Sequence, residues 1–312
     1  MSTLPLPQKL AIALKKRRPL YQANESARTD CVRLVDGSGD ALPGIYLEDF
    51  NGAWLVSTKA DSLSPALRAA FCEAAPGPLA WKHLSQHQKD SPVALNDHSL
   101  PEFFTGHESG LKTQLSFRSG YSQGIFLDQR DNRNRLRALS APGKKVLNTF
   151  AYTGMFSVAA AAAGATTTTL DLSQVYLDWA KENFRLNGLP PDDHYFCKGD
   201  TFHWLKRFAK QGRTFDAIVL DPPTFSRDDK GKVFRAASDY PRLFELALAC
   251  LAPGGTILAC TNARTVSSTQ FQKDLIKTLP RPTQATAQTH LAPMPPDFTE
   301  TPYLKSLWVT LA

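Results

Sequence analysis

The sequence predicts an α/β fold, in which a doubly wound, seven-stranded Rossmann-like domain follows a small α+β domain. From about residue 144, short β-type runs alternate with segments of helical spacing, a pattern typical of a parallel sheet covered by helices on both faces. Before that point, β-type runs are separated by turn pairs such as Asn51-Gly52, the strongest short hairpin signal. We therefore expect a basic N-terminal helix and linker over residues 1–25, the small domain over 26–120 and the doubly wound domain over 121–312.

The elements of the small domain are expected in the order strand, strand, strand, helix. The three β-type runs are Cys31–Val35, Ile45–Leu47 and Trp54–Thr58, and the helix covers Pro65–Ala75. The stretch Gln86–Glu108 is polar and irregular, so we expect it to form surface loops.

In the doubly wound domain each expected strand leads into a helix. The strands are Val146-Leu147, Thr166–Leu170, Tyr195–Cys197, Phe215–Leu220 and Thr256–Thr261. Helices are expected after Gly154, from Leu172 up to Asn187-Gly188, over Phe202–Phe208 and over Tyr240–Leu251. The C-terminal run Tyr303–Leu311 is expected to contribute to an antiparallel edge.

The composition limits the class of protein. Hydrophobic residues make up 42% of the 312 residues, and no apolar run approaches the roughly 18 residues of a membrane helix. No signal peptide is recognisable, so we expect a cytoplasmic protein without a membrane partner. The five scattered cysteines, with no C-x-x-C pair, indicate neither a disulfide framework nor a metal site. A formal charge of +7 favours a polyanionic partner such as RNA; the oligomeric state stays open, a homodimer included.

Candidate ligand-binding residues follow the expected strands. In a doubly wound sheet the ligand binds outside the carboxyl ends of the strands. The loop at 148–154, with Gly154 immediately before a helix, lies at such an end, as do Asp171, Asp200 and Asp221. One such aspartate is usually a helix N-cap. Three in succession on one edge favour a nucleotide-like ligand, with Asp171 accepting from ribose hydroxyls and Asp200 from an adenine amine.

The loop at 148–154 also bears on which nucleotide binds. It lacks the G-x-G-x-x-G pattern that lets the backbone approach a pyrophosphate. A single Gly154 beside the bulky Phe150 and Tyr152 suits S-adenosylmethionine, which has no phosphate, better than a dinucleotide. NAD, and with it a dehydrogenase, stays as an alternative.

The sharpest motif is Asp221-Pro222-Pro223-Thr224-Phe225 after a buried strand. Two prolines fix the backbone there, so that the Asp221 carboxylate can orient a planar base and Phe225 can stack on it. The alternative is a Pro-Pro turn with Phe225 in the core.

A second motif, Phe126-Leu127-Asp128-Gln129-Arg130, lies earlier in the chain. Arg130 could pair with the carboxylate of a methionine moiety and Gln129 could hydrogen-bond to it. The alternative is a surface turn with a structural Asp-Arg pair.

Together these motifs resemble the bacterial large-subunit (23S) rRNA methyltransferases, over roughly residues 30–312. The likeness rests on Phe126–Arg133, on Asn148–Gly154, on Thr169–Ser173 within the run Thr167–Ala180, with Asn183, Leu186, Asn187 and Gly188, and on Asp221–Ser226. It implies S-adenosylmethionine as cofactor, with Asp171 on the ribose, Asp200 on the adenine, and Gln129 and Arg130 on the methionine end. The other residues expected to line the cofactor site are Phe126, Asn148, Phe150, Tyr152, Thr153, Gly154, Leu172, Ser173 and Asp221.

Two branches of this family differ in chemistry. One makes 5-methylcytosine through a cysteine after the fifth strand; the other methylates guanine N7 and has an asparagine there. Asn262 occupies that place here, with Cys260 two residues earlier. Carbon-5 of cytosine needs covalent activation by a thiolate, whereas guanine N7 has a lone pair and does not.

The resemblance therefore implies an RNA methyltransferase acting on a guanine of 23S rRNA by direct SN2 transfer. Asp221 and Pro222 would position the base, Phe225 would stack on it and Asn262 would contact it. The front domain, at Leu34–Tyr46, looks more like the cytosine branch, so 5-methylcytosine formation is an alternative. Another is a ribosome-assembly module that binds the cofactor and RNA without catalysis.

Overall fold

The computed structural model describes residues 4–21, 24–84, 91–99, 101–118, 122–227 and 233–311. The chain divides into two compact units, of which the first contains Met1–Arg130 and Pro295–Pro302. The second contains Asp131–Met294 and Tyr303–Ala312.

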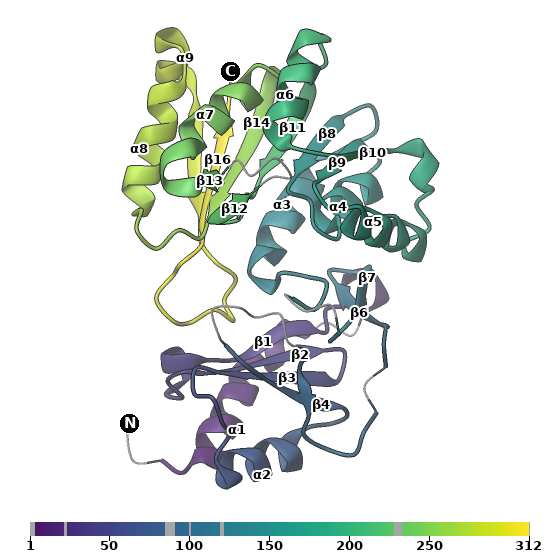
Figure 1. Cartoon of the computed structure of the whole chain (residues 1–312), viewed down its shortest axis with the longest axis vertical. Helices are drawn as coiled ribbons and strands as arrows, with labels where there is room; N and C mark the ends of the chain where they lie inside the picture. Colours follow the sequence, from purple (N-terminus) through teal and green to yellow (C-terminus); the bar gives the residue numbers. More distant parts are fainter. Residues whose placement is uncertain are drawn as a thin grey trace. The chain divides into compact units, whose positions relative to one another are not determined.

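The first unit is built on a five-stranded sheet whose strands follow the order β1-β2-β3-β4-β5. Leu10 and Ala13 of the first helix and Phe71 of the second are buried in one core with Val32 and Trp54 of the sheet, and both helices lie on one side of the sheet (Figure 1). The elements are α1 (Leu6–Arg17), η1 (Arg18–Leu20), η2 (Glu25–Ala27), β1 (Cys31–Asp36), η3 (Gly37–Asp40), β2 (Ile45–Phe50), β3 (Ala53–Thr58), α2 (Pro65–Ala74), β4 (Leu79–His83), β5 (Val93–Ala94), β6 (Phe104–Glu108), β7 (Leu111–Leu115) and η4 (Leu127–Gln129).

Local chemistry explains two elements of the first unit that the sequence predicts correctly. Asn51 and Gly52 both have positive φ, 55° and 86°, and join β2 to β3 where Phe50 pairs with Ala53, as a two-residue hairpin turn requires. Helix α2 begins where the Ser64 hydroxyl accepts a hydrogen bond from the Leu67 N–H.

The expectation of surface loops over Gln86–Glu108 is wrong in two places, and its residues 86–90 and 100 lie outside the described ranges. Val93 and Ala94 form β5, which pairs with β4. Residues 104–108 form β6, which pairs with β7 as an antiparallel hairpin. Gly106 is part of the reason, because a Cβ there would lie 2.4 Å from the Cys31 sulfur and 2.6 Å from Leu115. This glycine lets the hairpin approach β1, a long-range packing that local polarity does not reveal.

The second unit is the predicted doubly wound domain, with seven strands in the order β10-β9-β8-β11-β14-β16-β15. Its first five strands in this order are parallel, and β16 runs antiparallel to both neighbours. The C-terminal strand β16 is thus antiparallel as expected, but β15 forms the edge. The strands are β8 (Lys145–Thr149), β9 (Thr166–Asp171), β10 (Tyr195–Lys198), β11 (Phe215–Leu220), β14 (Leu251–Thr261), β15 (Gln288–Ala292) and β16 (Lys305–Thr310).

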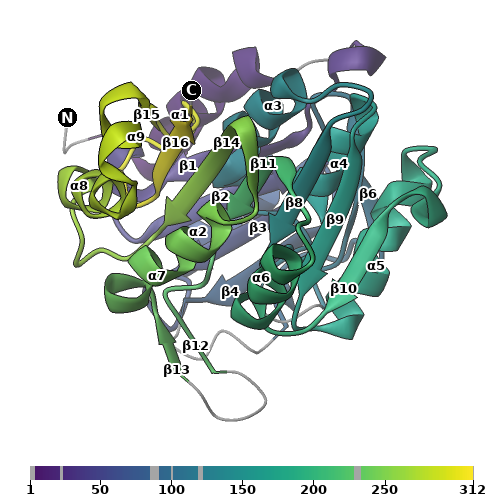
Figure 2. The ribbon, with the colours of Figure 1, turned by 90° about the horizontal axis from the view of Figure 1, so that it is seen from above.

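Helices cover both faces of this sheet (Figure 2). On one face the core joins α3 and α4 to the strands through residues such as Leu136, Phe156 and Trp308. On the other face it joins α6, α7 and α8 through Phe208, Phe244 and others. The helices are α3 (Arg130–Leu139), α4 (Met155–Ala162), α5 (Gln174–Leu186), α6 (Thr201–Lys210), α7 (Ala236–Leu248), α8 (Ser268–Thr278) and α9 (Arg281–Thr286), with η5 (Pro191–Asp193) and the two-stranded hairpin β12 (Phe225–Arg227) and β13 (Val233–Arg235).

The two units differ from the expected boundaries in three places. Helix α1 is not a separate segment, because its apolar side is part of the first core. The first unit extends to Arg130 rather than to residue 120, since η4 lies beside β1. It also takes in Pro295–Pro302, a segment between two strands of the second unit. The Arg130–Asp297 ion pair and a hydrogen bond from Arg17 to the Asp297 carbonyl hold it in the first unit.

Candidate functional site

The loop after β8 has an unusual backbone. Phe150 and Tyr152 have positive φ, 52° and 49°, and Gly154 follows at 77°. Positive φ is rare in bulky residues and costs on the order of 1–3 kcal/mol for each, so it persists only where the surroundings impose it. Such strain is concentrated in ligand-binding loops.

Hydrogen bonds from two neighbouring elements impose this conformation. The Ala151 N–H donates to the Leu170 carbonyl at 3.1 Å, and the Tyr152 N–H donates to the Asp171 carboxylate at 2.9 Å. From α5, the buried Asn183 amide donates to the Thr153 carbonyl at 2.8 Å. The loop is therefore fixed from both β9 and α5.

Asp171, the last residue of β9, has its carboxylate in a defined orientation. One oxygen accepts from Tyr152 N–H and the other from Ser173 N–H, both at 2.9 Å. Burial raises the pKa of this carboxyl, and the backbone N–H groups of Ser173, Tyr152 and Leu172 oppose the rise. A carboxylate has about four lone-pair sites, so these three N–H groups leave room for a further donor, and Asp171 is an oriented acceptor for a hydroxyl.

Other residues of this edge have structural roles. The Asn148 side chain is buried and donates to the Ser157 hydroxyl at 3.0 Å, and Thr153 is buried as well. Ser173 caps α5, where Leu172 immediately precedes it. The Tyr152 ring packs edge-on against Tyr176 at 4.6 Å between centroids.

Asp200 lies after β10 as expected and caps a helix. Its carboxylate accepts a hydrogen bond from the His203 N–H at 2.8 Å, at the first turn of α6. This is the ordinary role of an aspartate at a strand-to-helix turn. The side chain stays partly exposed, and its contact with an adenine stays a prediction.

Two strand ends of the sheet are tied together by Tyr240 of α7. Its buried hydroxyl donates to the Leu220 carbonyl at 2.7 Å, directly before Asp221. Burial raises the pKa of Tyr240 well above its usual value, and a hydrogen bond from the Cys260 backbone opposes the rise. The phenol thus bonds to the ends of both β11 and β14 and fixes how Asp221 and the residues after β14 are presented.

The residues after these two strands are in direct contact. The Thr224 hydroxyl donates to the side-chain oxygen of Asn262 in a short hydrogen bond. Pro222 is buried, whereas Asp221 is partly exposed and Asn262 is exposed. The structure therefore brings together the Asp221–Thr224 segment and Asn262, which were singled out from distant parts of the sequence. Phe225 begins β12, but its side chain lies outside what the structure describes.

Three expected cofactor residues, Phe126, Gln129 and Arg130, belong to the first unit. Gln129 is buried and Phe126 is exposed. Arg130 is buried too, and its guanidinium forms a bidentate pair with Asp297, with distances of 2.5 and 3.1 Å. The turn is thus buried rather than on the surface, while Arg130 does form a structural Arg-Asp pair, as the alternative expected, with a partner far away in sequence. Binding of these residues to a cofactor stays a prediction.

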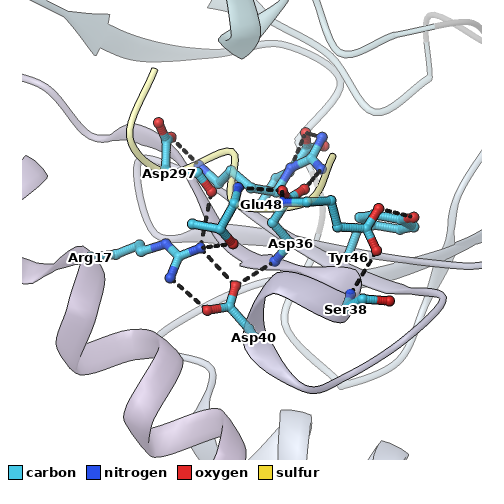
Figure 3. A network of polar contacts seen from close by, with 10 residues as sticks. Arg17, Asp36, Ser38, Asp40, Tyr46, Glu48 and Asp297 are labelled. Atoms are coloured by element: carbon cyan, nitrogen blue, oxygen red, sulfur yellow. Dashed lines mark hydrogen bonds and ion pairs between the residues drawn. The ribbon is translucent and has the colours of Figure 1, made fainter. Parts of the chain in front are cut away.

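Asp297 also belongs to a larger polar network in the first unit (Figure 3). Its carboxylate also accepts from the Arg33 N–H, and its carbonyl accepts from Arg17. Arg17 in turn forms a bidentate pair with Asp40, at 2.7 and 2.8 Å.

Sequence reasoning missed Tyr240 and Asp297 as supporting residues. Asn183, noted only as part of a motif, had a visible signal: it is a polar residue on the buried face of α5, beside Ala180 and Phe184. A polar side chain in such a position needs a buried partner. Tyr240 and Asp297 had no comparable local signal, because their partners come from other elements.

Within the described ranges, no cluster of three or more histidine, cysteine or acidic side chains could hold a metal ion. Nor is any described helix long and apolar enough to cross a membrane.

Comparison with known proteins gives consistent matches. Residues 74–307 match the family described as S-adenosylmethionine-dependent methyltransferase. The chain is 34% identical over 251 residues to ribosomal RNA large subunit methyltransferase I of Shewanella amazonensis, covering 77% of this chain and 63% of that protein. It is 30% identical over 320 residues to a ribosomal RNA large subunit methyltransferase of Deinococcus radiodurans, covering 97% of this chain and 78% of that one. A crystal structure described as a methyltransferase complexed with SAH matches with a TM-score of 0.86 and 29% identity, over 97% of this chain and 80% of that one. The chain thus spans about two thirds to four fifths of the relatives' lengths.

Proposed function

The chain belongs to the S-adenosylmethionine-dependent methyltransferase family, and on this basis we propose that it methylates guanine N7 in large-subunit rRNA. The predicted enzyme class and cofactor are confirmed at the level of the family. The RNA substrate is supported by the names of the relatives and by the formal charge of +7. A cytoplasmic location, where such a substrate would be met, stays a prediction.

The residues after β8 and β9 fit the cofactor. The Asp171 carboxylate, oriented by two backbone N–H groups, is suited to accept hydrogen bonds from the vicinal hydroxyls of a ribose. The loop with Phe150 and Tyr152 has no glycine-rich phosphate cradle, in keeping with a ligand that has no phosphate. When bound, the cofactor supplies an electrophilic methyl group on a sulfonium.

The choice of guanine as the proposed base rests on the contact between Thr224 and Asn262. Because the side-chain oxygen of Asn262 accepts from Thr224, the amide nitrogen is left to present donors. Asp221 presents acceptors. Guanine offers the complementary set, donors on its Watson–Crick edge and an acceptor at O6, so these two side chains can orient it while N7 keeps its lone pair for the methyl group.

The buried position of Cys260 argues against the 5-methylcytosine alternative. Cys260 is completely buried and its sulfur lies 3.8 Å from the Ser306 hydroxyl. It is part of the core on the α3 and α4 face of the sheet. A thiolate nucleophile must reach carbon-5 of cytosine, and a side chain in this position does not reach a base.

The test is methyl transfer from labelled cofactor to rRNA taken from cells that lack the protein, with the product mapped by mass spectrometry. We expect 7-methylguanine at one site. Finding 5-methylcytosine would contradict the proposed base, and absence of transfer to naked rRNA and to large-subunit particles would contradict the substrate.

Asp221→Ala and Asn262→Ala test the two base-orienting side chains. Loss of the acceptor at Asp221 is expected to lower the transfer rate by at least about a hundredfold. Loss of the Asn262 donor is expected to lower it by about ten- to a hundredfold, the worth of one base contact. Cofactor affinity, measured by calorimetry, should stay close to that of the wild type in Asn262→Ala and should change much less than the transfer rate in Asp221→Ala.

The matched control is Asp192→Ala, which removes an exposed carboxylate of η5 in the same unit. It should transfer methyl groups at the wild-type rate. If the Asp221 and Asn262 variants kept wild-type rates as well, the assignment of these residues to the base would be wrong.

A further inference from the structure

Helix α6 has two chemically distinct sides. Phe202, Leu205 and Phe208 are buried in the core against the sheet. The exposed side carries His203, Lys206, Arg207 and Lys210, at the i, i+3, i+4 and i+7 spacing that brings residues to one helix face. No acidic residue interrupts the sequence from Thr201 to Arg213.

In the part of the chain that the structure describes, Lys206, Arg207 and Lys210 form no ion pair with a carboxylate. The nearest acids in sequence already have partners: Asp200 caps α6, and Asp216 accepts from Lys144 and from the Lys145 N–H. A solvated helix face ordinarily mixes charges of both signs, so these three cations without neutralising acids create a locally positive surface.

Aromatic rings hold the two guanidinium groups of this surface. The Arg207 guanidinium lies over Trp204 at 4.9 Å from the ring centroid, and the indole N–H is anchored to the Lys198 carbonyl at 3.1 Å. Arg213 lies over Tyr195 at 4.7 Å and over Phe208 at 5.0 Å. Stacked guanidinium groups lose less conformational freedom when they bind an anion.

We propose that Lys206, Arg207, Lys210 and Arg213, here called the α6 basic face, bind the phosphate backbone of the RNA substrate. Lys206 and Lys210 are separated by about 6 Å along the helix axis. Phosphates repeat along an RNA strand, so a row of cations binds it without reading its sequence. The half-exposed Tyr195, in β10 at the edge of the sheet, adds a ring on which an unpaired base can stack.

The position of α6 relates this surface to the candidate site. The helix begins at Thr201, directly after the cap Asp200 at the carboxyl end of β10, and runs back along the sheet toward Arg213 and the start of β11. An RNA strand bound along it would extend from the edge that carries Asp171 and Asp221. This inference rests on the proposed function, since it takes the substrate to be RNA.

The test compares two triple variants of equal charge. Lys206→Gln, Arg207→Gln and Lys210→Gln remove three charges from the α6 basic face. The control variant, Lys273→Gln, Lys277→Gln and Arg281→Gln, removes two lysines and one arginine that are exposed on α8 and α9 of the same unit. Circular dichroism and cofactor affinity check that both variants are folded.

Binding of a fluorescein-labelled oligouridine is measured by anisotropy over a series of KCl concentrations. For the α6 variant we expect at least about tenfold weaker binding and a log–log salt slope shallower by about 2, since each phosphate contact on a single strand contributes about 0.7. The KM for rRNA should rise as well. The control variant should keep the wild-type affinity and slope.

The outcomes separate this inference from the proposed function. If the wild type methylates rRNA but both variants bind oligouridine alike, the α6 basic face is not the RNA-binding surface and the proposed function stands. If the wild type neither binds nor methylates RNA, both are overturned.

Discussion

Glycine is required at position 154 both by the backbone conformation and by the packing. Its φ of 77° favours glycine. In addition, a Cβ at this position would lie 2.7 Å from the Cβ of Ala180, closer than two carbons approach without a shift. The glycine therefore allows both the loop after β8 and the close approach of α4 to α5.

Replacing Gly154 by alanine should affect stability and cofactor binding together. The positive φ alone costs an L-residue about 1–2 kcal/mol, and relief of the Ala180 clash must move the loop that holds Asp171. We expect a lower thermal midpoint and weaker binding of S-adenosylmethionine, by at least about tenfold, measured by differential scanning calorimetry and titration calorimetry.

Gly188→Ala separates the two causes. Gly188 has a similar φ, 67°, but nothing lies within 4 Å of a Cβ there. It should lose stability through φ alone and keep the wild-type affinity for the cofactor. Equal losses in the two variants, with no change in affinity, would show that the packing against Ala180 does not matter.

At the scale of elements, Tyr240 joins a helix to two strand ends. Strands β11 and β14 present Asp221 and Asn262, and the hydroxyl of Tyr240 bonds to the backbone at the end of each. Neither base-orienting residue is on a rigid element itself, so the α7 phenol supplies rigidity that their loops lack.

Tyr240→Phe should therefore lower the rate more than the affinity for the cofactor. Removing the hydroxyl leaves the Leu220 carbonyl without its donor, which costs about 1–3 kcal/mol for a buried group. We expect kcat to fall by roughly tenfold, because Asp221 and Asn262 lose a fixed position, with little change in cofactor affinity. Single-turnover transfer and titration calorimetry measure the two effects.

Tyr21→Phe is the matched control for this substitution. It deletes another tyrosine hydroxyl, which donates to Asp49 at 2.6 Å in the first unit. Stability should fall, while kcat should not. A loss of rate as large as in Tyr240→Phe would assign the effect to general destabilisation.

The five parallel strands of the second unit were predictable because each is a short run of apolar or β-branched residues that ends at a polar turn, whereas β15 and the helices α3, α8 and α9 were not predicted. Phe215–Leu220 was predicted with its observed bounds. Strand β14 starts at Leu251, five residues before its expected start, because Pro253-Gly254 reads locally as a turn. The position of β16 between β14 and β15 was not predictable, since strand order depends on contacts between residues far apart in sequence.

The candidate site, like the fold, was predictable in part: the sequence indicates which residues share an edge of the sheet but not which side chains bond to each other. Asp171, Asp200 and Asp221 follow strands, so their common edge could be inferred from chain order alone. The hydrogen bond between Thr224 and Asn262 joins residues 38 apart, and nothing in the local sequence of either residue indicates the other. Residue types are visible in a sequence, whereas the pairs that orient them form only when the sheet does.

At the scale of the whole molecule, the chain passes between the two units three times. One segment of the first unit, Pro295–Pro302, lies in sequence between β15 and β16 of the methyltransferase sheet. Its Asp297 is nevertheless completely buried and belongs to the first unit. There it pairs with Arg130, 167 residues earlier, and accepts from the backbone of Arg33. This single carboxylate thus ties the end of η4 to β1.

Asp297→Ala should destabilise the first unit strongly. It would leave the buried Arg130 guanidinium without its carboxylate, and breaking one side of a buried ion pair costs about 3–5 kcal/mol. Asp297→Asn keeps an acceptor for Arg33 and should cost less. Hydrogen exchange read by mass spectrometry resolves the units, and we expect faster exchange in peptides from β1 and η4 than in peptides from β8 and β11.

The matched control, Asp178→Ala, removes the exposed partner of Lys181 on α5 and should change little, since surface ion pairs contribute little. Exchange in Asp297→Ala that matched this control would mean that Pro295–Pro302 is held in the first unit by packing, not by its carboxylate.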